Sequence, residues 1–179
     1  DEPENWRGML MNLRRPLFED IRVRQALNYF YDFETIRRLV HFGLYERVDT
    51  YFPNSEMAAS GLPEGRELEI LERYRDEIPE HVFTEPFEVP STQGSGSIRR
   101  NLREARALFA EAGWEVRDGR LTNIDTGEPM EFEIMYFNPD LERELVPLQR
   151  NFDRGGIEVT LRPVDSAQFQ RRMDEFDYD

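Results

Sequence analysis

Apolar residues recur at helical spacing along much of the chain. Val23, Ala26, Leu27 and Phe30 follow the i, i+3, i+4, i+7 pattern of one buried helix face, and Asp20 precedes them as a candidate N-cap. Four more predicted helices each follow a side chain that can cap a helix, namely Asp32, Ser97, Asn138 and Asp165. A glycine can end the second helix. We interpret the first two helices as an αα corner.

Alternation of apolar and polar residues predicts the strands. Residues 130–136 and 157–162 alternate in this way, so we expect them to form the core of a sheet. Residues 7–13 are interpreted as a short first strand and residues 176–179 as the start of a last one. Asp118-Gly119, between two strand-like runs, predicts a tight hairpin. Strands that alternate with helices indicate an α/β fold of βαβαβ type with parallel pairing.

The stretch from 48 to 97 has a different texture. Prolines interrupt it repeatedly, at Pro53, Pro63, Pro79, Pro86 and Pro90. A short amphipathic helix is the one regular element that its apolar residues suggest, through Leu68, Leu71, Tyr74 and Ile78. We therefore expect residues 48–97 to be a long irregular excursion on the surface of a single α/β lobe covering residues 1–179.

The composition argues against several classes of function. A formal net charge of -14 over 179 residues argues against a nucleic-acid binder, since such proteins carry a basic surface. The lack of cysteine excludes disulfides and zinc–thiolate sites, and His41 and His81 fit no spaced metal motif. No apolar run reaches the roughly 18 residues of a membrane span. The first residues do not resemble a signal peptide, so we expect an exported parent to carry its signal upstream.

Candidate catalytic and metal-binding groups are few. Gly94-Ser95-Gly96 lacks the lysine of a P-loop and does not follow a strand. Four carboxylates cluster late in the chain, at Asp174, Glu175, Asp177 and Asp179. Their spacing matches no full calcium or acid–base motif, so a solvated face is the better interpretation. The same holds for four arginines on one predicted helix, Arg99, Arg100, Arg103 and Arg106. We expect no metal, no cofactor and no enzymatic activity.

Several motifs together resemble one known family. Residues 18–34, Phe-Glu-Asp-Ile-Arg-Val-Arg-Gln-Ala-Leu-Asn-Tyr-Phe-Tyr-Asp-Phe-Glu, are similar to the signature of solute-binding protein family 5, the dipeptide, oligopeptide and nickel binders of ABC importers. Residues 105–114 resemble that family's helix ending in Ala-Gly-Trp, and residues 132–139 one of its closing strands. Residues 51–61, with Asp32-Phe-Glu, look like the branch of YejA-like oligopeptide and microcin C binders.

The resemblance implies a fold and a role. The fold would be a periplasmic binding protein-like (type II) lobe with a mixed sheet flanked by helices, and the chain would be the second, inserted lobe of two around a cleft. The parent would be a monomer in the periplasm that closes on a peptide or peptide-like ligand and docks on the permease subunits of an ABC importer. A ligand-sensing module for signalling is an alternative that shares the fold. A hydrolase domain with an acidic site is a further alternative.

Ligands of open α/β sheets bind beyond the carboxyl ends of the strands, beside helix starts. On that ground the predicted cleft-facing residues are Met9, Met11, Tyr136, Phe137 and Asn138. A place in the core or a helix cap explains Tyr136 and Asn138 equally well. The resemblance adds Arg171 and Arg172, whose guanidinium groups suit a ligand carboxylate. Stabilisation of a helix C-terminus by positive charge is the alternative for both arginines.

Overall fold

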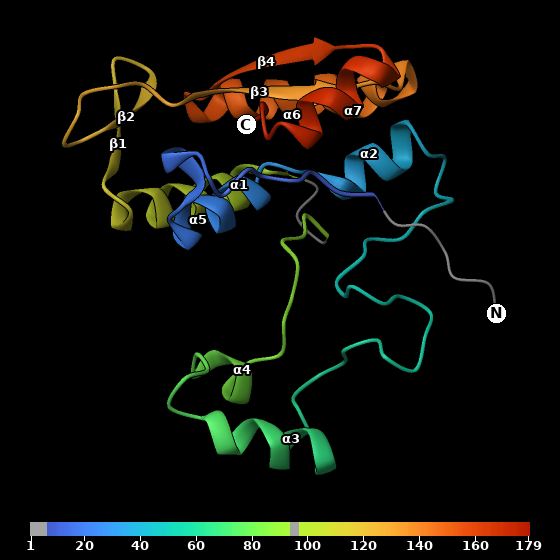
Figure 1. The fold of residues 1–179 in the computed structure, drawn as a ribbon. Coiled ribbons are helices and arrows are strands. Elements are labelled where there is room, and N and C mark those ends of the chain that lie inside the picture. Colours follow the sequence, from blue (N-terminus) through green and yellow to red (C-terminus); the bar gives the residue numbers. More distant parts are fainter. Residues whose placement is uncertain (1–6, 94–96) are drawn as a thin grey trace. The chain divides into compact units, whose positions relative to one another are not determined.

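The computed structural model describes residues 7–93 and 97–179, which divide into two compact units. The main unit comprises Met9–Tyr45 and Pro90–Asp179. The excursion unit comprises Glu46–Val89 together with residues 7 and 8. Figure 1 follows the chain through both units.

The main unit contains most of the regular structure. Its helices are α1 (Ile21–Asn28), α2 (Phe33–Leu39), α5 (Arg99–Glu111), α6 (Glu142–Gly155) and α7 (Ser166–Asp174), with 3-10 turns η1 (Pro16–Phe18) and η3 (Pro139–Leu141). Its strands are β1 (Trp114–Arg117), β2 (Arg120–Asn123), β3 (Glu131–Tyr136) and β4 (Glu158–Pro163). β1 and β2 form an antiparallel hairpin, and β3 and β4 form a parallel pair.

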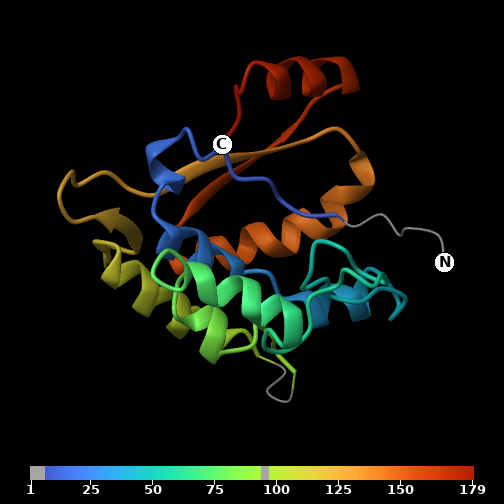
Figure 2. The same cartoon turned by 60° about the horizontal axis from the view of Figure 1, so that its bottom comes forward.

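The β3–α6–β4 crossover is the centre of this unit. The register pairs Glu131 with Glu158 at one end and Tyr136 with Pro163 at the other, so both strands finish at the same edge. α6 packs against β4, and Figure 2 separates α6 from α7, with the two strands running between them. The predicted strands 130–136 and 157–162 and the predicted α/β class are thereby confirmed.

Aromatic and aliphatic side chains from these elements form one core. Phe152 of α6 is fully buried, with its ring centroid 4.9 Å from that of Phe30 and 5.4 Å from that of Phe132. The predicted face of α1 is buried as well, through Val23, Ala26 and Leu27. The same helical spacing that predicted these helices therefore places their apolar faces in a shared interior.

Side-chain caps explain where the helices begin. The carboxylates of Asp20, Asp32 and Asp165 accept backbone N–H groups at 2.8, 3.2 and 2.8 Å, and they precede α1, α2 and α7. Asn138 caps η3, and Ser97 lies one residue before the N-cap of α5 with its hydroxyl 3.3 Å from an N–H of that helix. Capping accounts for the predicted starts. Within residues 7–93 and 97–179, no helix is long and apolar enough to cross a membrane.

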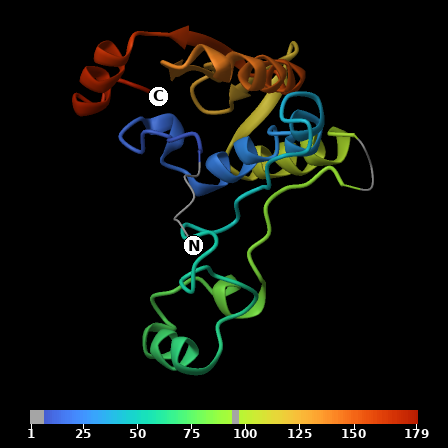
Figure 3. The same cartoon turned by 90° about the vertical axis from the view of Figure 1, so that its right-hand side faces the viewer.

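Two predicted strands are wrong. Residues 7–12 carry no strand, and neither does the segment 176–179, although the two meet at the N–H of Asn12, 2.9 Å from the carbonyl of Asp179. Figure 3 shows the C-terminus beside the blue segment that precedes α1. The remaining bonds between them come from the Asn12 side chain, and Phe176 has a positive φ of 55°. The two segments are thus joined mainly by one side chain and not by a ladder of backbone hydrogen bonds. Of the predicted βαβαβ unit, the structure contains β3–α6–β4, followed by α7.

The excursion unit has little regular structure. It contains α3 (Gly65–Leu71) and η2 (Glu72–Tyr74), which lie where a single short helix was predicted, and α4 (His81–Thr84), which was not predicted. None of its residues from 46 to 89 is buried. The irregular stretch predicted over 48–97 thus corresponds to Glu46–Val89, whereas residues 90–93 return to the main unit.

Candidate functional site

The candidate site lies at the edge where β3 and β4 both end. β3 is followed by Phe137 and Asn138, and the Asn138 side chain caps η3 at 3.0 Å. β4 is followed by Asp165, which caps α7. A bond of 3.0 Å from the N–H of Val164 to the carbonyl of Tyr136 holds the two exits together. Two capped helical segments therefore start beside the carboxyl ends of two parallel strands, the arrangement in which open α/β sheets bind ligands.

Two aromatic rings lie at this edge. Phe137 is 51% exposed, and its ring centroid lies 4.8 Å from that of Phe169 on α7. Tyr136, immediately before it, is only 5% exposed and belongs to the core. Burial raises the pKa of Tyr136, and the charge of Glu142 raises it further. The strand pleat explains the difference, since neighbouring residues point to opposite faces.

The two predicted methionines differ in the same way. Met9 is 43% exposed, whereas Met11 is partly buried and packs against the core. Both precede the segment that contacts residues 176–179. Among the predicted residues of this part of the chain, Met9 is therefore the one that offers a largely free side chain.

The two arginines of α7 have different surroundings. Nη1 of Arg172 donates to Glu133 at 2.8 Å, and its Nε donates to the carbonyl and carboxylate of Asp177 at 2.7 and 3.1 Å. The bond with Glu133 raises the pKa of Arg172 above its ordinary value. The Arg171 side chain is exposed and forms no hydrogen bond or ion pair with another described residue. Arg172 is thus occupied by the protein itself, while Arg171 is available to a ligand.

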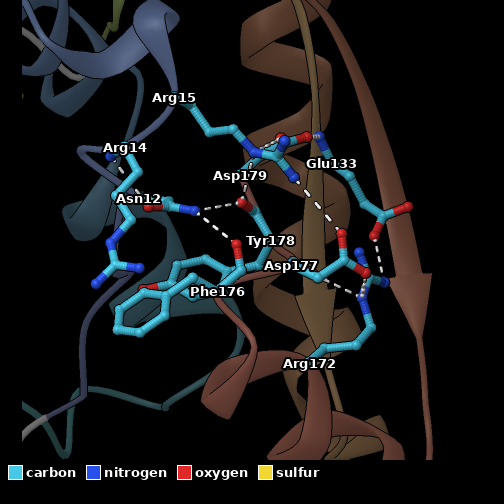
Figure 4. Close-up of polar contacts among 9 residues, drawn as sticks. All are labelled: Asn12, Arg14, Arg15, Glu133, Arg172, Phe176, Asp177, Tyr178 and Asp179. Atoms are coloured by element: carbon cyan, nitrogen blue, oxygen red, sulfur yellow. Dashed lines mark hydrogen bonds and ion pairs between the residues drawn. The ribbon is translucent and has the colours of Figure 1, made fainter.

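Glu133 anchors a charged network beside this edge (Figure 4). Its carboxylate accepts from Arg162 at 2.7 Å as well as from Arg172. Burial alone would raise the pKa of Glu133, but the hydrogen bonds from both arginines outweigh it and the pKa lies below its usual value. The alternating strand pattern had marked this position only as a polar residue of β3.

Asn12 joins the network from the other end of the sequence. Its side-chain amide donates to the carbonyls of Phe176 and Tyr178 at 3.0 and 2.9 Å, and it is 3% exposed. Arg15 lies 3.6 Å from the carboxylate of Asp177 and 3.4 Å from that of Asp179. Figure 4 shows these side chains converging between the segments that contain residues 12–15 and 176–179.

The predicted solvated carboxylate face is therefore only partly correct. Asp174 is exposed, as expected, but Asp177 and Asp179 pair with arginines, and Asp179 also accepts the N–H of Glu133 at 2.9 Å. Sequence reasoning missed Asn12, although a polar residue inside the apolar run 9–13 is a usable signal. The four arginines of α5 are all exposed, which confirms their solvated face. Among the described residues, no group of three or more His, Cys, Asp and Glu side chains could hold a metal ion.

Comparison with known proteins identifies one family over the whole chain. The model of the family described as bacterial extracellular solute-binding proteins, family 5 (middle region), matches residues 1–179. An uncharacterized protein y4wM of Sinorhizobium fredii is 44% identical over 172 residues, which is 96% of this chain and 26% of that protein. The probable peptide-binding protein YejA of Agrobacterium fabrum is 40% identical over 168 residues, 94% of this chain and 27% of that protein. The chain thus spans about a quarter of the length of these relatives.

A solved structure agrees on the fold. The oligopeptide-binding protein AppA of Bacillus subtilis, in complex with a nonapeptide, matches with a TM-score of 0.62 and 24% identity. The match covers 90% of this chain and 27% of AppA. At this identity the likeness concerns the fold alone.

Proposed function

The chain belongs to the bacterial extracellular solute-binding proteins of family 5, and from that membership we propose that it forms the second, inserted lobe of a two-lobed receptor. An inserted lobe needs its two connections to the rest of the protein at one place. The bond of 2.9 Å from the N–H of Asn12 to the carbonyl of Asp179 supports this proposal, because it brings residues 167 positions apart (179 − 12) side by side. The match to about a quarter of longer relatives supports the same division.

The proposed receptor captures a peptide or peptide-like solute outside the inner membrane, in the periplasm, and delivers it to the permease of an ABC importer. It acts as a monomer, by closing two lobes on the ligand, and catalyses no reaction. The observation that carries the proposal is the edge of β3 and β4, with its capped helix starts and the aromatic pair of Phe137 and Phe169. The names of YejA and AppA favour a peptide as ligand. The charge of -14 is consistent with a partner other than nucleic acid.

The seven proposed ligand-face residues divide by their surroundings. Phe137, Arg171 and Met9 have exposed side chains and are proposed as direct contacts, together with Asn138, which is partly exposed although its Oδ1 caps η3. Tyr136, Met11 and Arg172 are proposed as the layer beneath them, because core packing or ion pairs engage their side chains. An apolar surface with a few placed polar groups is typical of small-ligand sites.

The first test is mass spectrometry of the ligand that copurifies with the full-length parent under native conditions. We expect a peptide or a peptide conjugate bound at one per protein. A parent that carries only sugars or metal chelates in repeated preparations would overturn the assignment of the solute class, while a parent that turns over a substrate would overturn the receptor role.

The second test uses the two arginines of α7 as a matched pair. Calorimetry on the full-length parent would compare a peptide with its C-terminal amide, in wild type, Arg171→Ala and Arg172→Ala. We expect Arg171→Ala to remove the preference for the free acid, because a charge-assisted bond to a carboxylate contributes about 1.5–3 kcal/mol. Arg172→Ala should instead lower the melting temperature, since it leaves Glu133 with one partner fewer. Equal losses for acid and amide in Arg171→Ala would remove that residue from the site.

A further inference from the structure

The return limb, residues 90–93, is bound to the start of α2. Thr92 is a polar residue that is nevertheless only 3% exposed. Its partners are two carboxylates of the Asp32-Phe-Glu motif, which lie about 60 residues earlier in the sequence. The motif therefore holds the point at which the chain comes back from the excursion unit to the main unit.

Glu34 is the centre of this contact. One of its carboxylate oxygens accepts the hydroxyl of Ser91, and the other accepts the backbone N–H of Thr92 at 3.1 Å. The Ser91 hydroxyl in turn accepts the N–H of Gln93 at 3.1 Å, so its hydrogen is free for Glu34. Both limb groups are donors, and an ionised carboxylate, which only accepts hydrogen bonds, binds both more strongly than the neutral acid does.

Thr92 adds a constraint of its own. Its hydroxyl oxygen lies 2.7 Å from Asp32 and 2.9 Å from Glu34, yet it has a single hydrogen to donate. Asp32 is the nearer acceptor for this hydrogen, and it also caps α2 through the N–H of Thr35. The charge on Glu34 is thus held by Ser91 and by the Thr92 amide.

The charged surroundings of Glu34 are few. Burial raises its pKa, but the hydrogen bonds from Ser91 and Thr92 outweigh that effect and the pKa lies below its usual value. Asp32 shares the Thr92 hydroxyl with Glu34, and Asp32 also lines a pocket together with Arg99 of α5 and Arg154 of α6. The limb itself, Pro-Ser-Thr-Gln, contributes no charged side chain.

We propose that Glu34 is an acid-sensitive catch for the return limb: ionised, it holds Ser91 and Thr92 on α2, and protonated, it releases them. The outgoing limb is fixed separately, by His41 to Glu144 at 3.2 Å and by Arg37 to the carbonyl of Gly43 at 3.0 Å. Protonation of Glu34 therefore loosens one of the two connections of the excursion unit, whereas the contacts of the other do not involve Glu34. The inference is independent of the proposed ligand.

The amide of Thr92 reports on the catch directly, because its hydrogen bond ends on Glu34. Amide hydrogen exchange would be followed by NMR in this chain, in Glu34→Gln and in the control Glu104→Gln, an exposed acid on α5. At neutral pH we expect Glu34→Gln to exchange the Thr92 amide about tenfold faster than wild type and Glu104→Gln to match wild type. The buried Phe109 amide of α5 serves as the reference for global opening.

The pH dependence of Thr92 protection distinguishes release by protonation of Glu34 from the simple loss of a hydrogen bond. Between neutral pH and about pH 4, the protection of Thr92 relative to Phe109 should fall in wild type and stay flat in Glu34→Gln. Ser91→Ala provides a second variant that keeps the carboxylate, and it should shift the fall to higher pH. Thr92 protection that is equal in wild type and Glu34→Gln at neutral pH, or that rises in wild type on acidification, would overturn the proposal.

Discussion

The main unit and the excursion unit contain similar kinds of side chains but use them differently. Every buried apolar residue of the described chain belongs to Met9–Tyr45 or Pro90–Asp179. The excursion unit has large apolar residues too, yet they are exposed: Tyr51, Phe52, Met57, Leu62, Ile70, Tyr74 and Phe87. Hydrophobic content therefore does not make a core, because burial requires partners on a facing element.

Local contacts stabilise the excursion unit instead. Arg66 pairs with Glu69 at 2.7 Å, Arg75 pairs with Glu72, and the Arg75 guanidinium lies 4.1 Å from the Phe83 ring centroid. The ion pairs are largely exposed, and α3 has seven residues, fewer than an isolated helix needs for stability in water. We therefore expect the free energy of unfolding of this chain to come almost entirely from the main unit.

A matched pair of phenylalanines tests this difference most strongly. Phe152→Ala should lower the free energy of unfolding by about 3–5 kcal/mol, because it removes a fully buried ring that packs on Phe30 and Phe132. Phe87→Ala, at a position 71% exposed, should leave the urea midpoint unchanged. A loss of similar size in both variants would show that the excursion unit contributes a core of its own.

Two glycines with left-handed backbones give the next largest contrast. Gly156 ends α6 with a φ of 82°, and a Cβ there would lie 2.7 Å from the carbonyl oxygen of Gly119 and 2.8 Å from the amide of Leu121. Gly156→Ala should therefore lose about 1–2 kcal/mol for the conformation and about 1–3 kcal/mol more for the clash with the β1–β2 hairpin.

The control for Gly156 is Gly61 of the excursion unit. It has a φ of 64° and open space around the added Cβ, so Gly61→Ala should shift the transition by no more than the conformational part. Thermal unfolding of both variants gives the comparison. An equal shift would mean that the hairpin moves aside to accommodate the new methyl group.

The success of sequence-based prediction follows the same division between the units. Helical and alternating periods predicted α1, α6, β3 and β4, because each has a facing partner in the core. In Glu46–Val89 no residue is buried, so the apolar period only suggested one short helix near α3 and gave neither its bounds nor α4.

The candidate site was harder to predict because its side chains are placed by tertiary contacts. Its general location, beyond the carboxyl ends of two parallel strands, followed from the strand pattern. The distinction between Arg171 and Arg172 did not, because it depends on Glu133 and Asp177, which approach only in the folded chain. Asn12 illustrates the same limit, since its partners lie 164 and 166 residues away.

Two paired carboxylates provide the smallest and most specific contrast. Glu133 in β3 and Glu72 in the excursion unit both have a pKa below the usual value, but their surroundings differ. Burial opposes the effect at Glu133, where bonds from Arg162 and Arg172 outweigh it, whereas at Glu72 the bond from Arg75 is the leading cause. The Glu133 side chain is 19% exposed and that of Glu72 is 42% exposed. Screening by water should therefore remove most of the contribution of Glu72 to stability.

A lowered folded-state pKa fixes the sign of the pH dependence. The contribution of Glu133 is fully present above its unfolded pKa and is lost as the pH falls through the folded value. Glu133→Gln should cost about 1–3 kcal/mol near neutral pH, since it removes the charged acceptor that Arg162 and Arg172 share, and this cost should shrink as the pH is lowered. Glu72→Gln should match wild type at every pH.

Urea unfolding of the three proteins across the acid range measures the dependence of stability on pH for both variants. A cost for Glu133→Gln that stays constant with pH would mean that its effect comes from shape and not from charge, and a cost for Glu72→Gln of the same size would remove the distinction between the two units.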